Sequence, residues 1–277
     1  MRTRANYIRR IEIEGLWNKY SIAWDLKPDV NILSGVNGVG KTTILSKSVS
    51  FLDNIAGEAT NGTIDGVHLY FDPEDATYIV YDFIKSYDRP LVQGEFTARM
   101  ADKNVKSELD WQIYLMQRRY LDYQVNIGNR MIELLASKEA ADHVKAAEIS
   151  KPKQLFQDSI DELFSYTNKK IARQRNDIAF YQNDELLLPY KLSSGEKQMV
   201  LILLTALVED NQHCVLFMDE PEASLHIEWQ QKLIGKITKL NPNAQIILTT
   251  HSPAVIMEGW IDKVTEVEDI TTNSKKH

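Results

Sequence analysis

The sequence has 277 residues, of which 43% are apolar and 26% charged, and its net charge is −7 at pH 7. This composition excludes a largely disordered chain, and the acidic balance argues against a uniformly basic nucleic-acid surface. The longest apolar run, Met199 to Val208, is interrupted only by Thr205 and is too short to cross a bilayer, so no membrane span is expected. A single cysteine, Cys214, excludes an internal disulfide. The single cysteine and the lack of an apolar stretch of signal-peptide length at the N-terminus together indicate a cytoplasmic protein.

The first part of the chain is predicted to be β-rich and to lead into a helix. Alternating residues predict two half-buried strands, an apolar strand follows them, and a helix begins after a glycine-rich loop. These elements are expected at Arg10 to Gly15, Ser21 to Leu26, Val30 to Leu33 and Lys41 to Leu52. Two more β-rich runs, Gly66 to Phe71 and Thr77 to Ile84, predict an antiparallel side sheet.

The middle of the chain is predicted to be helical. Apolar residues recur every three or four positions between Ser107 and Leu135, and again from Lys153 to about Arg175. We expect a helical hairpin or small lobe, linked through the polar, Ala-rich segment 137–152. Residues 101–176 contain 13 Lys and Arg against 11 Asp and Glu, which leaves a charge of −9 on the rest. An anionic partner would therefore be sought at this lobe.

After Asp184 the sequence alternates between strands and helices. An apolar helix follows LSSGEKQ, and the strand CVLFMDEP, a helix from about Leu225 to Leu240 and the strand QIILTTHSP come after it. This alternation predicts an α/β fold with a mainly parallel sheet.

Residues 35–42, GVNGVGKT, match the P-loop pattern and lie between a predicted strand and helix. The loop and helix N-terminus would direct N–H groups at phosphates, while Lys41 reaches the β- and γ-phosphates of ATP and Thr42 ligates Mg²⁺. The alternative is a glycine-rich turn that binds nothing. The expected nucleotide-binding residues of the loop are Gly35, Asn37, Gly38, Gly40, Lys41, Thr42 and Thr43.

An acidic pair follows the apolar strand that begins at Cys214. Asp219 and Glu220 would lie at the carboxyl edge of a parallel sheet, beside the phosphates. We expect Asp219 to hold Mg²⁺, directly or through water, and Glu220 to polarise the attacking water. Acidic residues also often simply terminate a strand.

LSSGEKQ, residues 192–198, resembles the signature loop of ABC ATPases. The resemblance implies that Ser193 and Gly195 of one subunit contact the γ-phosphate held by the P-loop of another. Ser194 and Glu196 depart modestly from the common glycine and glutamine. His251, in TTHSP, is similar to the family's switch histidine, which hydrogen-bonds the γ-phosphate. Taken alone, each segment could instead be an ordinary helix or strand cap.

The segment DEPEASLH, residues 219–226, resembles the soluble RecF, OLD and SMC-like group more than membrane transporters, although Ile227 replaces a common proline. The resemblance implies an ABC-type P-loop NTPase with a mainly parallel core sheet, an antiparallel side sheet and an inserted helical hairpin lobe. The expected parts are 1–96 with the P-loop, a lobe at 97–184, and 185–277 with the signature loop, acidic strand and histidine.

Three assignments stay open. Gln93 is the candidate for a glutamine loop that links Mg²⁺ to the lobe, or it is a surface residue. One of Trp17, Tyr20 and Trp24 is expected to contact adenine, while core packing explains at least two of them. The cluster Lys169, Lys170, Arg173 and Arg175 lines a phosphate-binding groove on the second lobe helix or is solvated helix surface.

The resemblance implies an ATPase that closes as a homodimer or higher oligomer on ATP. Because the chain stops 26 residues after His251, we expect no fused nuclease. The first hypothesis is a switch that controls a separate effector, such as a nuclease or toxin, in bacterial anti-phage defence. The alternative is a DNA-repair or DNA-maintenance clamp that holds DNA across the dimer. A transporter subunit is disfavoured by the segment from Glu222 to His226.

Overall fold

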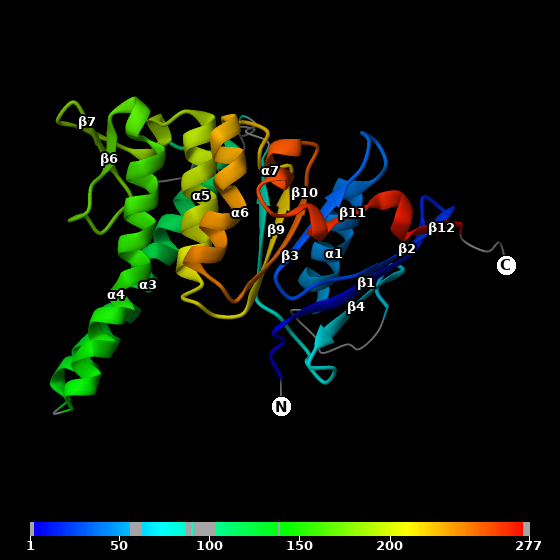
Figure 1. Cartoon of the computed structure of the whole chain (residues 1–277), viewed down its shortest axis with the longest axis horizontal. Coiled ribbons are helices and arrows are strands. Elements are labelled where there is room, and N and C mark those ends of the chain that lie inside the picture. The colour runs from blue at the N-terminus through cyan, green and yellow to red at the C-terminus, as the bar shows by residue number, and fades with distance from the viewer. Residues whose placement is uncertain (1–2, 56–62, 87–89, 91–102, 138, 274–277) are drawn as a thin grey trace.

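A computed structural model describes residues 3–55, 63–86, 90, 103–137 and 139–273. Its centre is a five-stranded, entirely parallel sheet (Figure 1). In spatial order the strands are β11 (Val264–Glu266), β3 (Val30–Ser34), β10 (Ala244–Thr249), β9 (Cys214–Asp219) and β5 (Tyr81–Lys85). The predicted α/β fold with a mainly parallel sheet is confirmed.

Successive side chains of the central strands enter two different hydrophobic cores, because side chains alternate between the faces of a strand. In β9, Leu216 and Met218 join the core that lies under the long helices of residues 108–136, 140–163, 194–208 and 227–240. Val215 and Phe217 join the core on the opposite face of the sheet. All four side chains are completely buried. The continuous apolar run of β9 therefore reflects burial on both faces, as is usual for parallel strands.

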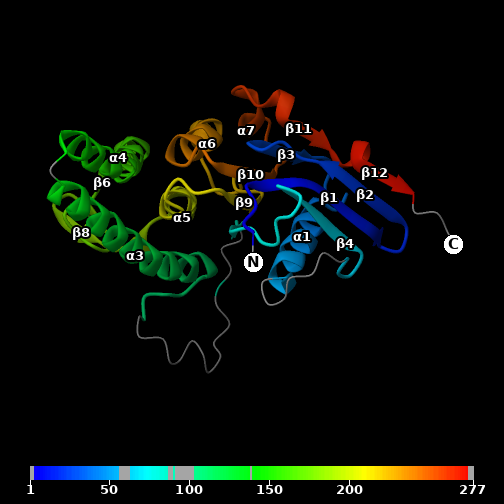
Figure 2. The same cartoon turned by 90° about the horizontal axis from the view of Figure 1, so that it is seen from below.

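One face of the core sheet is covered by helix α1 (Lys41–Ile55) and an antiparallel sheet (Figures 1 and 2). This sheet has the order β12 (Thr271–Asn273), β2 (Tyr20–Asp25), β1 (Tyr7–Leu16) and β4 (Val67–Asp72). The predicted antiparallel side sheet is confirmed for β1, β2 and β4.

The other face is covered by helices α5 (Ser194–Val208) and α6 (Ile227–Leu240), with α3 (Glu108–Ala136) and α4 (Ala140–Leu163) packed beyond them (Figure 2). A small antiparallel sheet follows α4 and consists of β6 (Lys169–Ile171), β7 (Phe180–Gln182) and β8 (Glu185–Leu187). Helix α7 (Pro253–Met257) follows β10. Four 3-10 turns complete the described elements, at Ser165–Thr167, Pro189–Lys191, Ile261–Lys263 and Val267–Ile270.

The prediction for residues 77–84 is wrong in its pairing. The strand begins at Tyr81, and β5 pairs in parallel with β9 in the core sheet rather than with the antiparallel sheet. The cis-Pro73 turn and the following residues separate β4 from β5, and Ile84 of β5 lies in the core under the long helices. A β-rich run of this length does not show from its own pattern which neighbour it will pair with.

The second predicted helix of the middle region is also wrong in its limits. Helix α4 begins at Ala140, in the segment expected to be a linker, and ends at Leu163. Pro152 lies inside it. Residues 169–171 form the strand β6, so the basic cluster from Lys169 to Arg175 is not on a helix.

Two ion-pair clusters join α3 to the rest of the molecule. Asp110 of α3 lies 2.8 Å from Lys197 of α5, and both side chains are nearly inaccessible to solvent. Further along α3, Arg119 contacts Asp82 of β5 at 2.6 Å and also Glu209 at the end of α5. The first turn of α3 is stabilised by a capping box between Ser107 and Asp110.

None of the helices in the described residues is long and apolar enough to span a bilayer.

Candidate functional site

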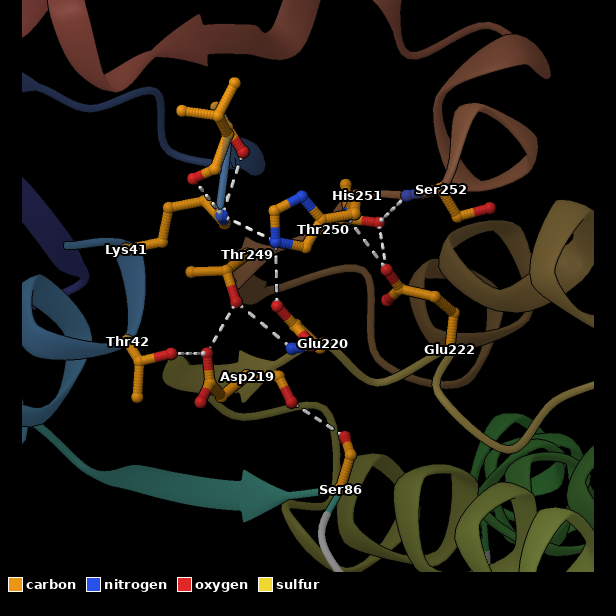
Figure 3. A network of polar contacts seen from close by, with 12 residues as sticks. Lys41, Thr42, Ser86, Asp219, Glu220, Glu222, Thr249, Thr250, His251 and Ser252 are labelled. Carbon is orange, nitrogen blue, oxygen red and sulfur yellow. Dashed lines mark hydrogen bonds and ion pairs between the residues drawn. The ribbon is translucent and has the colours of Figure 1, made fainter. Parts of the chain in front are cut away.

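The glycine-rich loop joins β3 to α1 and brings Lys41 toward the carboxyl edge of the core sheet (Figure 3). The Lys41 ammonium donates to the carbonyl oxygens of Gly35 at 2.9 Å and Val36 at 3.3 Å, and its Nζ lies 2.7 Å from His251 Nε2. The side chain is buried, and burial lowers the pKa of Lys41, although Glu220 and Asp219 act in the opposite direction. A buried cation is thus held against the glycine-rich loop.

Asp219 is the last residue of β9 and lies beside the first turn of α1. The hydroxyl of Thr42 donates to Asp219 Oδ1 at 3.0 Å, and the hydroxyl of Thr249 donates to the same oxygen at 2.7 Å (Figure 3). The Asp219 carbonyl accepts from Ser86 Oγ at 2.7 Å. The sequence patterns did not identify Thr249 or Ser86, although each lies at the carboxyl end of a core strand.

Glu220 has a left-handed backbone conformation, with φ of 47°, which is uncommon for a residue other than glycine. Its N–H donates to the carbonyl and to the hydroxyl oxygen of Thr249, each at 3.1 Å. This turn directs the Glu220 carboxylate to His251, where Oε1 lies 3.0 Å from Nε2. Both side chains remain partly accessible, so the carboxylate and the imidazole can reach a bound molecule. The structure therefore brings together Lys41, Thr42, Asp219, Glu220 and His251.

The signature-like loop lies on the opposite side of the core sheet from α1, at the N-terminus of α5. Ser193 is the N-cap of this helix and forms a capping box with Glu196. A Cβ placed on Gly195 would lie 2.4 Å from the carbonyl oxygen of Ser224, so no larger residue fits there without a shift. Ser193 and Gly195 thus belong to the layer of α5 and α6, while the phosphate loop belongs to the layer of α1 (Figure 2).

Glu196 anchors the signature-like loop to the small sheet. Its carboxylate accepts from Lys169 Nζ at 2.8 and 3.1 Å, from Thr167 Oγ1 at 3.0 Å and from the Ser193 N–H at 3.0 Å. Burial alone would raise the pKa of Glu196, but these bonds to Lys169, Ser193 and Thr167 hold it below its ordinary value. The glutamate that departs from the common glutamine is therefore the centre of a buried ionic network.

Trp17 is the aromatic residue that reaches the phosphate loop. Trp17 and Asn18 both have positive φ in the tight turn between β1 and β2, and half of the Trp17 side chain is exposed. A Cβ on Gly40 would lie 2.6 Å from the indole ring. Trp17 and Tyr20 line a pocket together with Gly38 and Val39 of the loop. Trp24, by contrast, is buried in the core.

Most of the basic cluster is neutralised by neighbouring carboxylates. Lys169 is bonded to Glu196, Arg173 lies within 2.7 Å of Asp158 and 2.5 Å of Asp161, and Arg175 lies 2.6 Å from Asp177. These pairs remove most of the positive field that a phosphate-binding groove would need. Gln93 lies outside the described residues.

Comparison with known proteins shows the family to which the chain belongs. A family model described as "AAA domain, putative AbiEii toxin, Type IV TA system" matches residues 91–258. The chain belongs to this AAA family. The matched segment includes the signature-like loop, the acidic pair and His251, while the phosphate loop precedes it. The prediction that the chain is an ABC-type AAA ATPase is confirmed.

Two curated proteins and one solved structure are similar to this AAA protein. The chain is 28% identical over 211 residues to "Retron Vc95 probable ATPase" of Vibrio cholerae serotype O1 biovar El Tor, in an alignment that covers 71% of the chain and 40% of the relative. It is 23% identical to "Septu protein PtuA" of Bacillus thuringiensis, over 93% of the chain and 74% of the relative. An SMC head bound to the C-terminal winged-helix domain of ScpA has the same fold, with a TM-score of 0.51, 12% identity and 91% coverage of each chain.

Proposed function

We propose that the protein binds ATP with Mg²⁺ and hydrolyses it. The observation that supports this proposal best is the convergence of Lys41, Thr42, Asp219, Glu220 and His251 at one edge of the core sheet. Their chemistry matches what phosphoryl transfer to water needs, which is a cation for the phosphates, oxygen ligands for a metal and a carboxylate that can accept a proton. The exposed Trp17 ring beside the phosphate loop supplies a surface for adenine.

The oxygen atoms near the phosphate loop fit Mg²⁺. Thr42 Oγ1 and Asp219 Oδ1 lie 3.0 Å apart, and both are hard oxygen ligands. Among the described residues there is no group of three or more His, Cys, Asp and Glu side chains placed to hold a metal. Mg²⁺ usually takes one or two protein ligands and completes its shell with phosphate and water. We propose Gln93 as a further ligand. The bound cation would neutralise charge on the phosphates.

The side chains of the chain itself have separate tasks in this proposal. When ATP binds, the Lys41 ammonium gives up its hydrogen bonds to the loop carbonyls and donates to phosphate oxygens instead. Glu220 accepts the proton of the attacking water, since its carboxylate is partly exposed and is held in place by the Thr249 bonds to its backbone. His251 contacts the γ-phosphate and, through Nε2, orients Glu220. The loop N–H groups from Gly35 to Thr43, Asn37 included, bind the remaining phosphate oxygens.

We also propose that the site is completed by a second copy of the chain. Ser193 and Gly195 lie in a different layer from the phosphate loop, so the loop of one subunit and the signature residues of another would enclose each nucleotide. Residues 97–184, which contain α3, α4 and the start of the small sheet, would form a lobe inserted between the two parts of the ATPase. The ion pairs of Asp110 and Arg119 would transmit movement of α5 to this lobe.

Closure on ATP is proposed to control a separate effector, such as a nuclease or toxin, in anti-phage defence. The support is the similarity to retron and Septu proteins. The alternative, a clamp that holds DNA across the dimer, is less favoured because Lys169, Arg173 and Arg175 are already paired with carboxylates.

The test compares the wild-type protein with Glu220→Gln in the presence of Mg²⁺ and ATP. The wild type should hydrolyse ATP, and Glu220→Gln should lose about 100-fold or more in kcat while it still binds ATP. Light scattering should show that ATP raises the mass of Glu220→Gln to that of a dimer or larger assembly. Absence of hydrolysis by the wild type, or of any ATP-dependent assembly, would overturn the proposal.

A further inference from the structure

The loop that carries His251 is bonded to the segment that follows the acidic pair. Glu222 lies in this segment, and its Oε1 accepts hydrogen bonds from the Thr250 hydroxyl and, at 3.1 Å, from the His251 backbone N–H (Figure 3). The Thr250 side chain is completely buried, and Glu222 is only 7% exposed. A single carboxylate oxygen therefore bonds both the Thr250 side chain and the backbone N–H of His251.

The second oxygen of Glu222 shows that this contact is costly to maintain. Oε2 is buried and accepts no hydrogen bond from the part of the chain that the structure describes. Burial also raises the pKa of Glu222, despite the two bonds to Oε1. A buried carboxyl with half of its bonding capacity unused costs stability. Glu222 is therefore kept at this position, despite its cost, by the two bonds to Oε1.

Gln230 of α6 forms a second connection on the far side of His251. Its Oε1 accepts from Ser252 Oγ at 2.6 Å, and its Nε2 donates to the Leu225 carbonyl at 2.9 Å. The loops at 220–226 and 250–252 are thus joined before and after the histidine. The imidazole itself stays one-third exposed and points toward Lys41 and Glu220.

We propose that Glu222 is the positioning residue for His251: it fixes the backbone from which the imidazole reaches Glu220 and the γ-phosphate. This inference rests on the proposed ATPase function and adds a residue to it that does not itself touch the nucleotide. Loss of the contact should misplace the imidazole and leave nucleotide binding by Lys41, Thr42 and Trp17 in place. The defect should accordingly appear in kcat rather than in the affinity for ATP.

Two pairs of variants separate positioning from general stability. Glu222→Gln keeps an Oε1 acceptor and should retain kcat within about threefold, whereas Glu222→Ala should lower kcat about 10- to 100-fold at nearly unchanged KM. Thr250→Ser keeps the hydroxyl and should behave like the wild type, and Thr250→Val should lose part of the activity. Thr205→Val is the matched control, since Thr205 is equally buried and its hydroxyl donates to the Leu201 carbonyl of the same helix, α5. Melting temperatures are measured for all five variants.

A double-variant comparison identifies the residue through which Glu222 acts. In a His251→Ala background, Glu222→Ala should lower kcat by no more than about twofold, because the group it positions is already absent. The proposal is overturned if Glu222→Ala keeps wild-type kcat, if Glu222→Gln is as defective as Glu222→Ala, or if the two losses multiply. If Glu222→Ala does not fold, the Thr250 pair decides: Thr250→Val should lower kcat and Thr250→Ser should not, and equal kcat values for the two would overturn the proposal. Lack of hydrolysis by the wild type would instead refute the ATPase function, and this inference with it.

Discussion

His251 Nε2 lies 2.7 Å from Lys41 Nζ and 3.0 Å from Glu220 Oε1, so a single imidazole nitrogen faces both a cation and a carboxylate. In one tautomer of the ring this nitrogen accepts a hydrogen bond from the lysine, and in the other it donates one to the glutamate. It cannot do both at once. If a bound phosphate draws Lys41 away, Nε2 would therefore be free to face Glu220 and the nucleotide.

Lys41→Ala should weaken ATP binding about 10- to 100-fold, because a hydrogen bond between charged groups contributes about 1.5–3 kcal/mol. Titration calorimetry with Mg²⁺ and ATP measures the affinity. Lys191→Ala, at an exposed lysine before the signature-like loop, is the control and should bind normally. Equal affinities for Lys41→Ala and the wild type would mean that the glycine-rich loop does not hold phosphate.

Trp17→Ala should lower ATP affinity by a similar factor, since stacking of a base on an aromatic ring is worth about 1–3 kcal/mol. The side chain is half exposed, so stability should change little. Tyr166→Ala is the control: it removes an aromatic ring that is 84% exposed and lies away from the phosphate loop, and it should leave the affinity for ATP unchanged. Unchanged affinity for adenine nucleotides in Trp17→Ala would assign the ring to another task.

Mixing two inactive variants should restore activity if each site is shared between subunits. Lys41→Ala lacks the phosphate cation and Ser193→Ala lacks the signature hydroxyl, so neither homodimer contains a complete site. A mixed dimer has one complete site, and equal mixing should recover about a quarter of the wild-type rate if the two sites act independently. Each variant mixed only with itself supplies the baseline. No recovery above that baseline would argue for sites contained within one subunit.

Glu196→Gln should lower the free energy of unfolding by about 1.5–3 kcal/mol near neutral pH, because it breaks the charged bonds with Lys169. The folded-state pKa of Glu196 lies below its ordinary value of 4.5, so its contribution is present above pH 4.5 and is lost as the pH falls through the folded pKa. Urea unfolding of both proteins from pH 7 down to pH 3 should show their difference shrinking. Glu185→Gln, at an exposed glutamate of the small sheet, is the control; a difference that does not depend on pH would contradict the ionic assignment.

The sequence patterns located the parts of the site that depend on local structure. The strand, loop and helix around Lys41 and the apolar strand before Asp219 each follow from a short segment, and the parallel sheet then brings both to the same edge. Neither Thr249 nor Glu222 could be assigned to the site in this way. Each acts through a partner at least 28 residues away in sequence, and threonine or glutamate at these positions has no special local signal.

The errors of prediction arose where tertiary packing decides between similar local patterns. Tyr81 to Lys85 is a β-rich run that could enter either sheet, and only its pairing with β9 shows which one it joins. The Ala-rich segment before Pro152 is polar, and within residues 141–151 Ala146 alone is buried. The helix is anchored by its second half, where Phe156, Ile160 and Leu163 lie in the hydrophobic core. Residues 169–171 were predicted to continue the helix because the apolar spacing extends across them, but they pair with β7 as the strand β6.

The order of the core sheet also determines when a nucleotide site can first exist during synthesis. Strand β3, which leads into the phosphate loop, pairs only with β10 and β11 among the described strands, and these come more than 200 residues later. A nascent chain that has emerged only as far as α5 would therefore contain the whole glycine-rich loop without the strands that align it. Such non-local pairing slows folding. The nucleotide site could accordingly form only after residues 244–266 have left the ribosome.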